Sequence, residues 1–373
     1  MDDAFGTDLY LLLTEPAGNT VFSPASVAAA LRMALCGARG ETAAELAAAL
    51  HLSVPADRTA DAAAEGLRSL SGLVGAAMAD DTGIFRVANT AWVQSGLPLR
   101  PEFTARLDQT ASAGIAAADF ARAHEAARAE INQAVEKLTE GKITGLLAPG
   151  SVTELTRLVL ANAVYLKAPW HDPFPERDTR DAPFYPRGRD AARVTVPMMR
   201  GTATRHYLRG DGYQAVLLPY ARSRLAMAVV LPDGSLAGLR RTLAAAGLGA
   251  LLAGTAARQV TLWMPRFRVE ASFDLIAALR QLGVTLAFSR DADFSGIAEA
   301  ARLLIGAVAH KAYIDVDEIG TEAAAATAAL FAAAAAMLRP PPPVTMIVDR
   351  PFLFAIIDTT DGTPMFLGQV TRP

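Results

Sequence analysis

The stretch that decides the fold runs from Glu318 to Thr327 and reads EIGTEAAAAT. A strand made from this stretch has two different faces, because side chains alternate along a strand. One face carries Thr321, Ala323, Ala325 and Thr327, and the other carries Glu322, Ala324 and Ala326. Small side chains can enter a closed sheet between two existing strands without clashing with packed neighbours. The pattern therefore predicts a segment that can become a new middle strand.

Gly320 adds a pivot at the start of this segment, since glycine adopts backbone angles that other residues avoid. The same alanines also favour an α-helix, because alanine has the highest helix propensity. Residues 323–336 are mostly alanine and are followed by four prolines at 340–343. Taken alone, the segment is equally compatible with an inserting loop and with an alanine helix.

The rest of the chain indicates an α+β fold, with helices early and strands late. Residues 8–52 read as helices around a loop, and Ser23 before Pro24 is a good helix start. Residues 158–166 are almost continuously apolar, which is typical of a strand covered on both faces. Other predicted elements are helices at 125–138 and 273–282 and strands at 87–93, 215–218, 225–231 and 260–269.

Composition limits the classes of function. The chain has 373 residues, 52% of them hydrophobic and 20% charged, which is ordinary for a folded protein. A net charge of -3 without a dense Lys/Arg run argues against nucleic acid or an anionic membrane as a partner. The single cysteine, Cys36, has no partner for an internal disulfide. Residues 323–338 are too short and too rich in alanine for a membrane span, and no signal peptide is visible at the N-terminus.

Motifs for catalysis, metals and cofactors are absent from the sequence. The five histidines are scattered, so no metal site is predicted. There is no Gly-rich phosphate loop and no Gly-x-Ser-x-Gly turn. A Ser/His/Asp triad is a spatial arrangement that a sequence does not exclude, but nothing here points to one. We therefore expect neither an enzyme nor a cofactor.

From Glu318 to Thr327 the segment resembles the hinge motif of the serpin family. Blocks that resemble serpin motifs occur in the family's order along nearly the whole chain. They include residues 23–26, 37–42, 139–143, 157–165, 218–220, 265–267, 292–296, 310–312 and 350–354. The resemblance implies one serpin domain over 1–373, with helices packed around a large mixed central sheet, smaller sheets and an exposed reactive-centre loop. Residues 318–343 would form the hinge and that loop.

The resemblance implies inhibition of a serine protease by suicide cleavage of the loop, covalent acyl-enzyme trapping and loop insertion. In inhibitory serpins the attacked bond follows the seventeenth residue counted from the hinge glutamate, which is Ala334 here, so the bond is Ala334–Ala335. The loop is several residues longer than is usual, which leaves Met337–Leu338 as the second choice. Arg339 precedes Pro340, a poor bond to present. An alanine suits elastase-like or subtilisin-like proteases.

The resemblance also assigns supporting residues. Ser23, Ser26, Asn162 and His310 match the shutter beneath the point where the sheet opens, and Trp170, Arg266 and Glu318 match the breach at its top. Each assignment has a simpler alternative: Ser23 and Ser26 as helix caps, His310 as a satisfied core residue, and Arg266 with Glu318 as a surface ion pair. Leu166, Ala168 and Ile319 depart from the family's usual residues.

The predicted partner is a target serine protease held in a covalent complex by a monomeric inhibitor. Activation by a glycosaminoglycan is not expected, because residues 76–81 are acidic where activated serpins carry a basic helix. The alternative is a non-inhibitory serpin that acts as a binding or structural protein. Its hinge would usually have lost the small residues that this chain keeps. The compartment remains open: cytoplasmic by default, with export possible.

Overall fold

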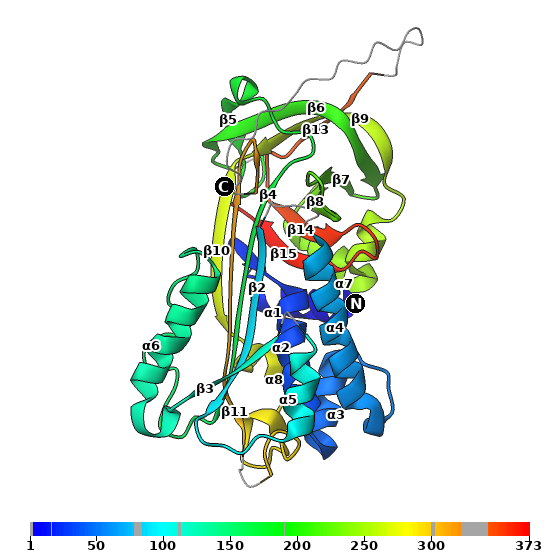
Figure 1. Ribbon diagram of the computed structural model, residues 1–373. Helices are drawn as coiled ribbons and strands as arrows, with labels where there is room; N and C mark the ends of the chain where they lie inside the picture. The colour runs from blue at the N-terminus through cyan, green and yellow to red at the C-terminus, as the bar shows by residue number, and fades with distance from the viewer. Residues whose placement is uncertain are drawn as a thin grey trace.

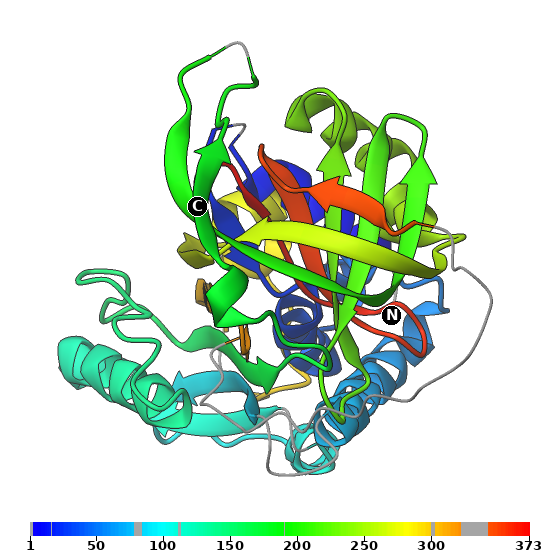
Figure 2. The same cartoon turned by 90° about the horizontal axis from the view of Figure 1, so that it is seen from above.

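The computed structural model describes residues 3–15, 17–77, 84–110, 113–189, 191–299, 303–321 and 342–373. Two sheets organise these residues (Figure 1). The larger sheet lies at the upper end of the molecule, and the long strands of the smaller sheet run downward from it between helices. Seen from above, β6 and β9 of the larger sheet lie across this upper end (Figure 2).

The smaller sheet has six strands and contains the stretch that decides the fold. Its order is β10 (Phe267–Asp274), β11 (Ile305–Val316), β12 (Gly320–Thr321), β4 (Leu158–Pro169), β2 (Ile84–Gln94) and β3 (Gly114–Ala118). The pairs β10–β11 and β2–β4 are antiparallel, whereas β11 and β4 also pair directly with each other in parallel. The sheet is therefore mixed, because β4–β11 in its centre and β2–β3 at its edge are parallel pairs.

The larger sheet has nine strands. Its order is β1 (Thr20–Phe22), β15 (Pro364–Val370), β14 (Phe352–Asp358), β8 (Leu225–Pro232), β7 (Tyr213–Pro219), β6 (Val194–Gly210), β9 (Ala256–Pro265) and β13 (Val344–Ile347), with β5 (Arg180–Phe184) paired to β6. Strands β12 and β13, which flank the segment 322–341, thus belong to different sheets.

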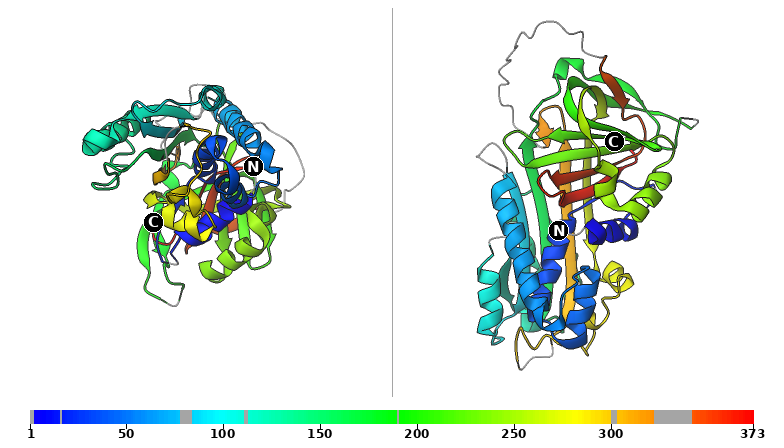
Figure 3. Two further views of the ribbon diagram at one scale, coloured as in Figure 1. Left: turned by 90° about the horizontal axis from the view of Figure 1, so that it is seen from below. Right: turned by 90° about the vertical axis from the view of Figure 1, so that its right-hand side faces the viewer.

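Most helices of the described residues surround the lower part of the six-stranded sheet, and α4 runs alongside its long strands, whereas α7 packs beside β7 and β8 of the larger sheet (Figure 3, right). They are α1 (Asp3–Leu13), α2 (Pro24–Gly37), α3 (Gly40–Ala49), α4 (Thr59–Ala77), α5 (Pro101–Asp108), α6 (Phe120–Leu138), α7 (Leu236–Leu252) and α8 (Ile276–Gln281). Short 3₁₀ turns occur at Ala56–Arg58, Glu176–Asp178 and Leu286–Phe288. None of these helices is both long and apolar enough to cross a bilayer.

Strand β4 shows why residues 158–166 are almost wholly apolar. Its even-numbered residues from Leu158 to Leu166, apart from Asn162, join the core that contains α2, and its odd-numbered residues from Val159 to Tyr165 join a second core under α6. Helix α2 begins where expected, with the Ser23 hydroxyl accepting a hydrogen bond from the Ser26 amide and Pro24 in the first turn. The α+β fold and the central buried strand are confirmed.

Two predicted elements were wrong in their boundaries. Residues 260–269 are not one strand, because the chain leaves the larger sheet at Pro265 and enters the smaller one at Phe267. A proline has no N–H to donate to a ladder, and the Arg266 amide donates to Pro197 instead. The helix predicted at 273–282 is only Ile276–Gln281, since Phe273 pairs with His310 on β11.

Candidate functional site

The six-stranded sheet has a line between β4 and β11 that is parted at its upper end and closed below. At the upper end Thr321 is opposite Ala168 on β4 and Val316 on β11, and β12 is antiparallel to both neighbours. Below it the two neighbours pair directly, from Leu158 with Ile305 up to Tyr165 with Tyr313. We call this the opening line. Its upper end already contains Gly320 and Thr321 of the predicted hinge.

Gly320 and Thr321 fill this upper end closely. A Cβ on Gly320 would lie 2.2 Å from the Ala168 carbonyl oxygen, so only glycine fits. The Thr321 side chain is 0% exposed, and its hydroxyl shares a 2.7 Å hydrogen bond with the Tyr220 hydroxyl. The Tyr220 ring stacks on Trp170 with centroids 4.7 Å apart. Thr321 therefore faces the apolar core from a position inside the sheet.

Residues 317–320 form a compact turn above this point. The Asp317 carboxylate accepts hydrogen bonds from the amides of Ile319 (2.8 Å) and Gly320 (3.1 Å). Trp170 holds the turn from the side of β4, since its amide donates to the Ile319 carbonyl and its indole N–H to the Asp317 carbonyl. The predicted breach residue Trp170 thus binds the backbone that leads into the predicted hinge.

Glu318 is buried beside the same turn, with 2% of its surface exposed. Its Oε1 accepts from Arg266 Nε at 2.8 Å and Nη2 at 2.7 Å, and from the Thr179 hydroxyl at 2.5 Å. Burial alone would raise the pKa of Glu318, but the hydrogen bonds from Arg266 and Thr179 outweigh it and hold that pKa below its ordinary value. The carboxylate stays ionised and ties the turn to Arg266, between β9 and β10, and to the segment before β5.

A row of polar side chains crosses the opening line in the middle of the sheet. Asn89 on β2, Asn162 on β4 and His310 on β11 are register partners. The Asn162 amide nitrogen donates to the Ser26 carbonyl at 2.8 Å and to Asn89 Oδ1, and Ser26 Oγ donates to Asn89 Oδ1 at 2.9 Å. The row therefore anchors α2 to three strands at once.

His310 closes this row on the β11 side. The Ser23 amide donates to Nε2 at 3.0 Å, so Nδ1 carries the proton that bonds Asn162 Oδ1. Burial lowers the pKa of His310 to about 3, because a charged ring would lose its hydration at this position. The His310–Asn162 hydrogen bond spans the opening line and breaks if the two strands separate.

The opposite face of the sheet carries a second tie across the same region. Lys311 Nζ donates to the Thr144 carbonyl at 2.8 Å and pairs with Glu270 at 2.6 Å. Thr144 follows α6, which packs on the β2 and β4 side of the sheet. Both faces of the middle of the opening line are therefore held by polar contacts.

Comparison with known proteins identifies the family. The family model described as "Serpin (serine protease inhibitor)" matches residues 2–373. The chain belongs to the serpin family. A leukocyte elastase inhibitor from Sus scrofa is 38% identical over 99% of this chain and 97% of that protein.

Solved serpin structures have the same fold. Serpin48 of Tenebrio molitor has a TM-score of 0.85 and 30% identity, covering 100% of this chain and 96% of that one. Human thyroxine-binding globulin, solved with its hormone, has a TM-score of 0.85 and 27% identity over 100% and 97%. This serpin is therefore a member of a family of protease inhibitors, not of a catalytic family.

Three contacts of the serpin's opening line were missed from the sequence: those of Asn89, Tyr220 and Thr179. A signal existed for Asn89, because it interrupts the alternating apolar residues Phe85, Val87, Ala91 and Val93 on one face of β2. A polar residue on the buried face of a strand needs a partner. Tyr220 lies in the serpin-like block 218–220, but neither Tyr220 nor Thr179 gave a signal for its partner, since only the tertiary fold brings them to the predicted hinge.

Part of the predicted site lies outside the described residues. This holds for the hinge residues Glu322, Ala323, Ala324, Ala325, Ala326 and Thr327 and for the bonds Ala334–Ala335 and Met337–Leu338.

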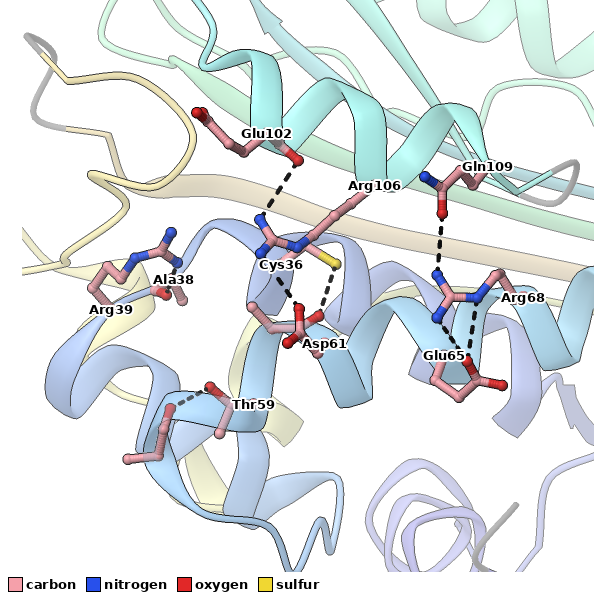
Figure 4. A network of polar contacts seen from close by, with 12 residues as sticks. Cys36, Ala38, Arg39, Thr59, Asp61, Glu65, Arg68, Glu102, Arg106 and Gln109 are labelled. Carbon is pink, nitrogen blue, oxygen red and sulfur yellow. Dashed lines mark hydrogen bonds and ion pairs between the residues drawn. The ribbon is translucent and has the colours of Figure 1, made fainter.

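The single thiol, Cys36, is far from reactive: burial raises its pKa to about 12, and it lies within the polar network between α2, α4 and α5 (Figure 4).

Proposed function

We propose that this serpin inhibits a serine endopeptidase by offering the loop between β12 and β13 for cleavage. The protease serine attacks the Ala334 carbonyl, the bond to the Ala335 nitrogen breaks, and the amine leaves with a proton. An ester then joins Ala334 to the protease. Residues after Thr321 insert along the opening line and distort the attached enzyme before water frees it. The observation that carries this proposal is that Gly320 and Thr321 already lie between β4 and β11, antiparallel to both.

The register of β12 predicts where the inserted residues go. Extended down the opening line, it brings Thr327 opposite both Asn162 and His310, and Phe331 opposite Leu158 at the lower end of β4. Thr327 shares the face of Thr321, so its hydroxyl would enter the polar row from which the His310–Asn162 hydrogen bond is lost. Residues 322–331 are the length that the line accepts, which leaves Ala334 just beyond it.

The free energy favours insertion. One parallel ladder between β4 and β11 is replaced by two antiparallel ladders, which are slightly more stable for each residue. A strand of this length adds about ten hydrogen bonds, each stabilising by ~0.5 to 1.5 kcal/mol net. Their sum is comparable to the stability of a whole domain. The uncleaved form is then metastable, because the intact loop cannot enter the line along its full length.

The target is a protease with a small primary pocket, elastase-like or subtilisin-like. Ala334 places a methyl group in that pocket and gives trypsin-like enzymes no charge to pair. The similarity to a protein named leukocyte elastase inhibitor supports the same class. If the attacked bond is Met337–Leu338 instead, the pocket is larger and apolar.

The test is to incubate the serpin with pancreatic elastase and, separately, with subtilisin, and to run a denaturing gel. We expect a covalent band heavier than either partner, and a higher melting temperature for serpin cleaved within 328–339. Thr327→Arg should abolish both, because the register directs this charge into the core beside Asn162. Glu322→Arg is the matched control, since position 322 already carries a charge and alternates to the other face.

Other outcomes have definite meanings. Clean cleavage with no covalent band and no rise in melting temperature would support a non-inhibitory serpin that acts as a binding or structural protein. Full inhibition by Thr327→Arg would contradict insertion in this register. Mass spectrometry of the released C-terminal fragment decides between Ala334–Ala335 and Met337–Leu338.

A further inference from the structure

Arg32 on α2 is a buried cation with two unsatisfied guanidinium nitrogens. It is 6% exposed, and its Nε and Nη1 atoms have no hydrogen-bond partner in the part of the chain that the structure describes. Other arginines of the neighbouring helices are paired: Arg68 with Glu65 at 2.6 Å and Arg106 with Asp61 at 3.4 Å (Figure 4). Arg32 therefore differs from the ordinary surface arginines around it.

The surrounding helices are shaped to hold this guanidinium. A Cβ at Gly66 on α4 would lie 2.5 Å from Arg32 Nε, so the glycine leaves the space in which the side chain packs. Ala25, Ala28 and Arg32 share one stripe of α2, and helical side chains point back toward the N-terminus. The long side chain thus runs over the two alanines toward the first turn of α2.

A small cavity lies at the end of this stripe. Its volume is about 10 Å³, which is room for one water molecule or one small ion. It is lined by Phe5, Pro24, Ala25, Ala28, Arg32, Leu50 and Pro364. None of these residues is acidic. Asp8 on α1, three residues after the lining residue Phe5, is paired with His51 at 2.8 Å.

The charge of Arg32 needs compensation that the described residues do not supply. Burial lowers the pKa of Arg32, and no carboxylate offsets this effect. Arginine nevertheless stays protonated in proteins, so the site is positive at neutral pH. Water can hydrogen-bond a guanidinium but cannot neutralise it, whereas an anion does both. The first turn of α2 adds the partial positive charge of a helix N-terminus on the same side.

We propose that Arg32 anchors a small monovalent anion of halide size in this cavity. The anion accepts hydrogen bonds from the guanidinium and fills the space between Ala28, Pro24 and Pro364. Larger anions are excluded by the volume of the cavity. Because the anion binds the folded chain and not the unfolded one, its binding stabilises the fold.

The experiment compares melting temperatures in sodium bromide and sodium gluconate at constant ionic strength, because gluconate is too large for the cavity. We expect a saturable rise of roughly 1 to 3 °C as bromide replaces gluconate. Crystals grown in bromide should show an anomalous scattering peak beside Arg32. A flat melting temperature, or an ordered water at this position in high bromide, would overturn the proposal.

Variants separate this site from general salt effects. Arg32→Met removes the charge with little change in volume, and we expect it to fold at least as well in gluconate and to lose the bromide response. Ala28→Val keeps Arg32 but fills the cavity, so it should also lose the response. Arg68→Met removes a paired arginine two residues beyond Gly66, and this variant should keep the bromide response. A bromide response that survives both Arg32→Met and Ala28→Val would contradict the site.

Discussion

The upper end and the middle of the opening line are held together in different ways. At its upper end β4 and β11 are already separated by Gly320 and Thr321, and the contacts are a backbone turn and the Glu318–Arg266 pair. In the middle the same strands pair directly, with His310 and Asn162 bonded on one face. If the loop inserts as proposed, this difference predicts that entry is prepared at the upper end and that resistance to insertion lies in the middle.

The largest effect is expected from Asn162→Ala. It removes the side chain that joins Ser26, Asn89 and His310, and it leaves several buried polar groups without partners. We expect the free energy of unfolding to fall by about 3 kcal/mol, measured in urea. Asn132→Ala is the control, because its contacts with Leu147 are only partly buried, and it should cost about 1 kcal/mol. Equal losses of unfolding free energy in the two variants would contradict a special role for the polar row in the middle of the opening line.

The next effect is a pH dependence carried by His310. Its native pKa of about 3 is below the ordinary 6.5, so below pH 6.5 the unfolded chain binds a proton that the folded chain does not. The contribution of His310 to the free energy of unfolding is fully present above pH 6.5. It is lost as the pH falls, by up to ~1.4 kcal/mol for each pH unit, or about 2 kcal/mol by pH 5. His310→Gln can still accept from Ser23 and donate to Asn162. Its free energy of unfolding should therefore change less between pH 7.5 and 5 than that of the unmodified protein. The same slope in both proteins would show that His310 does not carry it.

The smallest effect tests the upper end. Arg266→Met leaves the Glu318 carboxylate buried with only Thr179 as a side-chain partner, and we expect a cost of about 1 to 2 kcal/mol. Arg268→Met is the matched control two residues away, since Arg268 is 68% exposed and pairs with Asp315 at the surface. It should cost less than ~1 kcal/mol. If the two variants lose the same free energy of unfolding, the Glu318–Arg266 pair is an ordinary surface ion pair and does not hold the upper end of the opening line.

Much of the fold was predictable from local patterns. The apolar run of β4 and the Ser23–Pro24 helix start were read correctly, because burial on both faces and helix capping leave their mark on neighbouring residues. The boundary at Pro265 was missed, because an apolar run continues across it while the chain changes sheets. Phe273 was assigned to a helix by its spacing, but the ladder with β11 determined its conformation.

The candidate site likewise has features that a single stretch of sequence contains and contacts that it does not. Small residues after Gly320 and the acidic Glu318 stand in one stretch, so the sequence predicted a segment fit for insertion. The partners of that stretch come from distant elements: Tyr220 for Thr321, and Thr179 and Arg266 for Glu318. No periodicity of the chain relates these positions.

By itself the sequence determined what can be inserted: a run of small side chains behind a glycine, because side-chain size and backbone freedom are local properties. Only the tertiary structure decided where the segment would go in the proposed insertion. The register of Gly320 and Thr321 between β4 and β11, and the row formed by Asn89, Asn162 and His310, arise from pairing between strands far apart in the chain. Hydrogen bonds of that kind depend on the positions of both partners, which no single stretch of sequence contains.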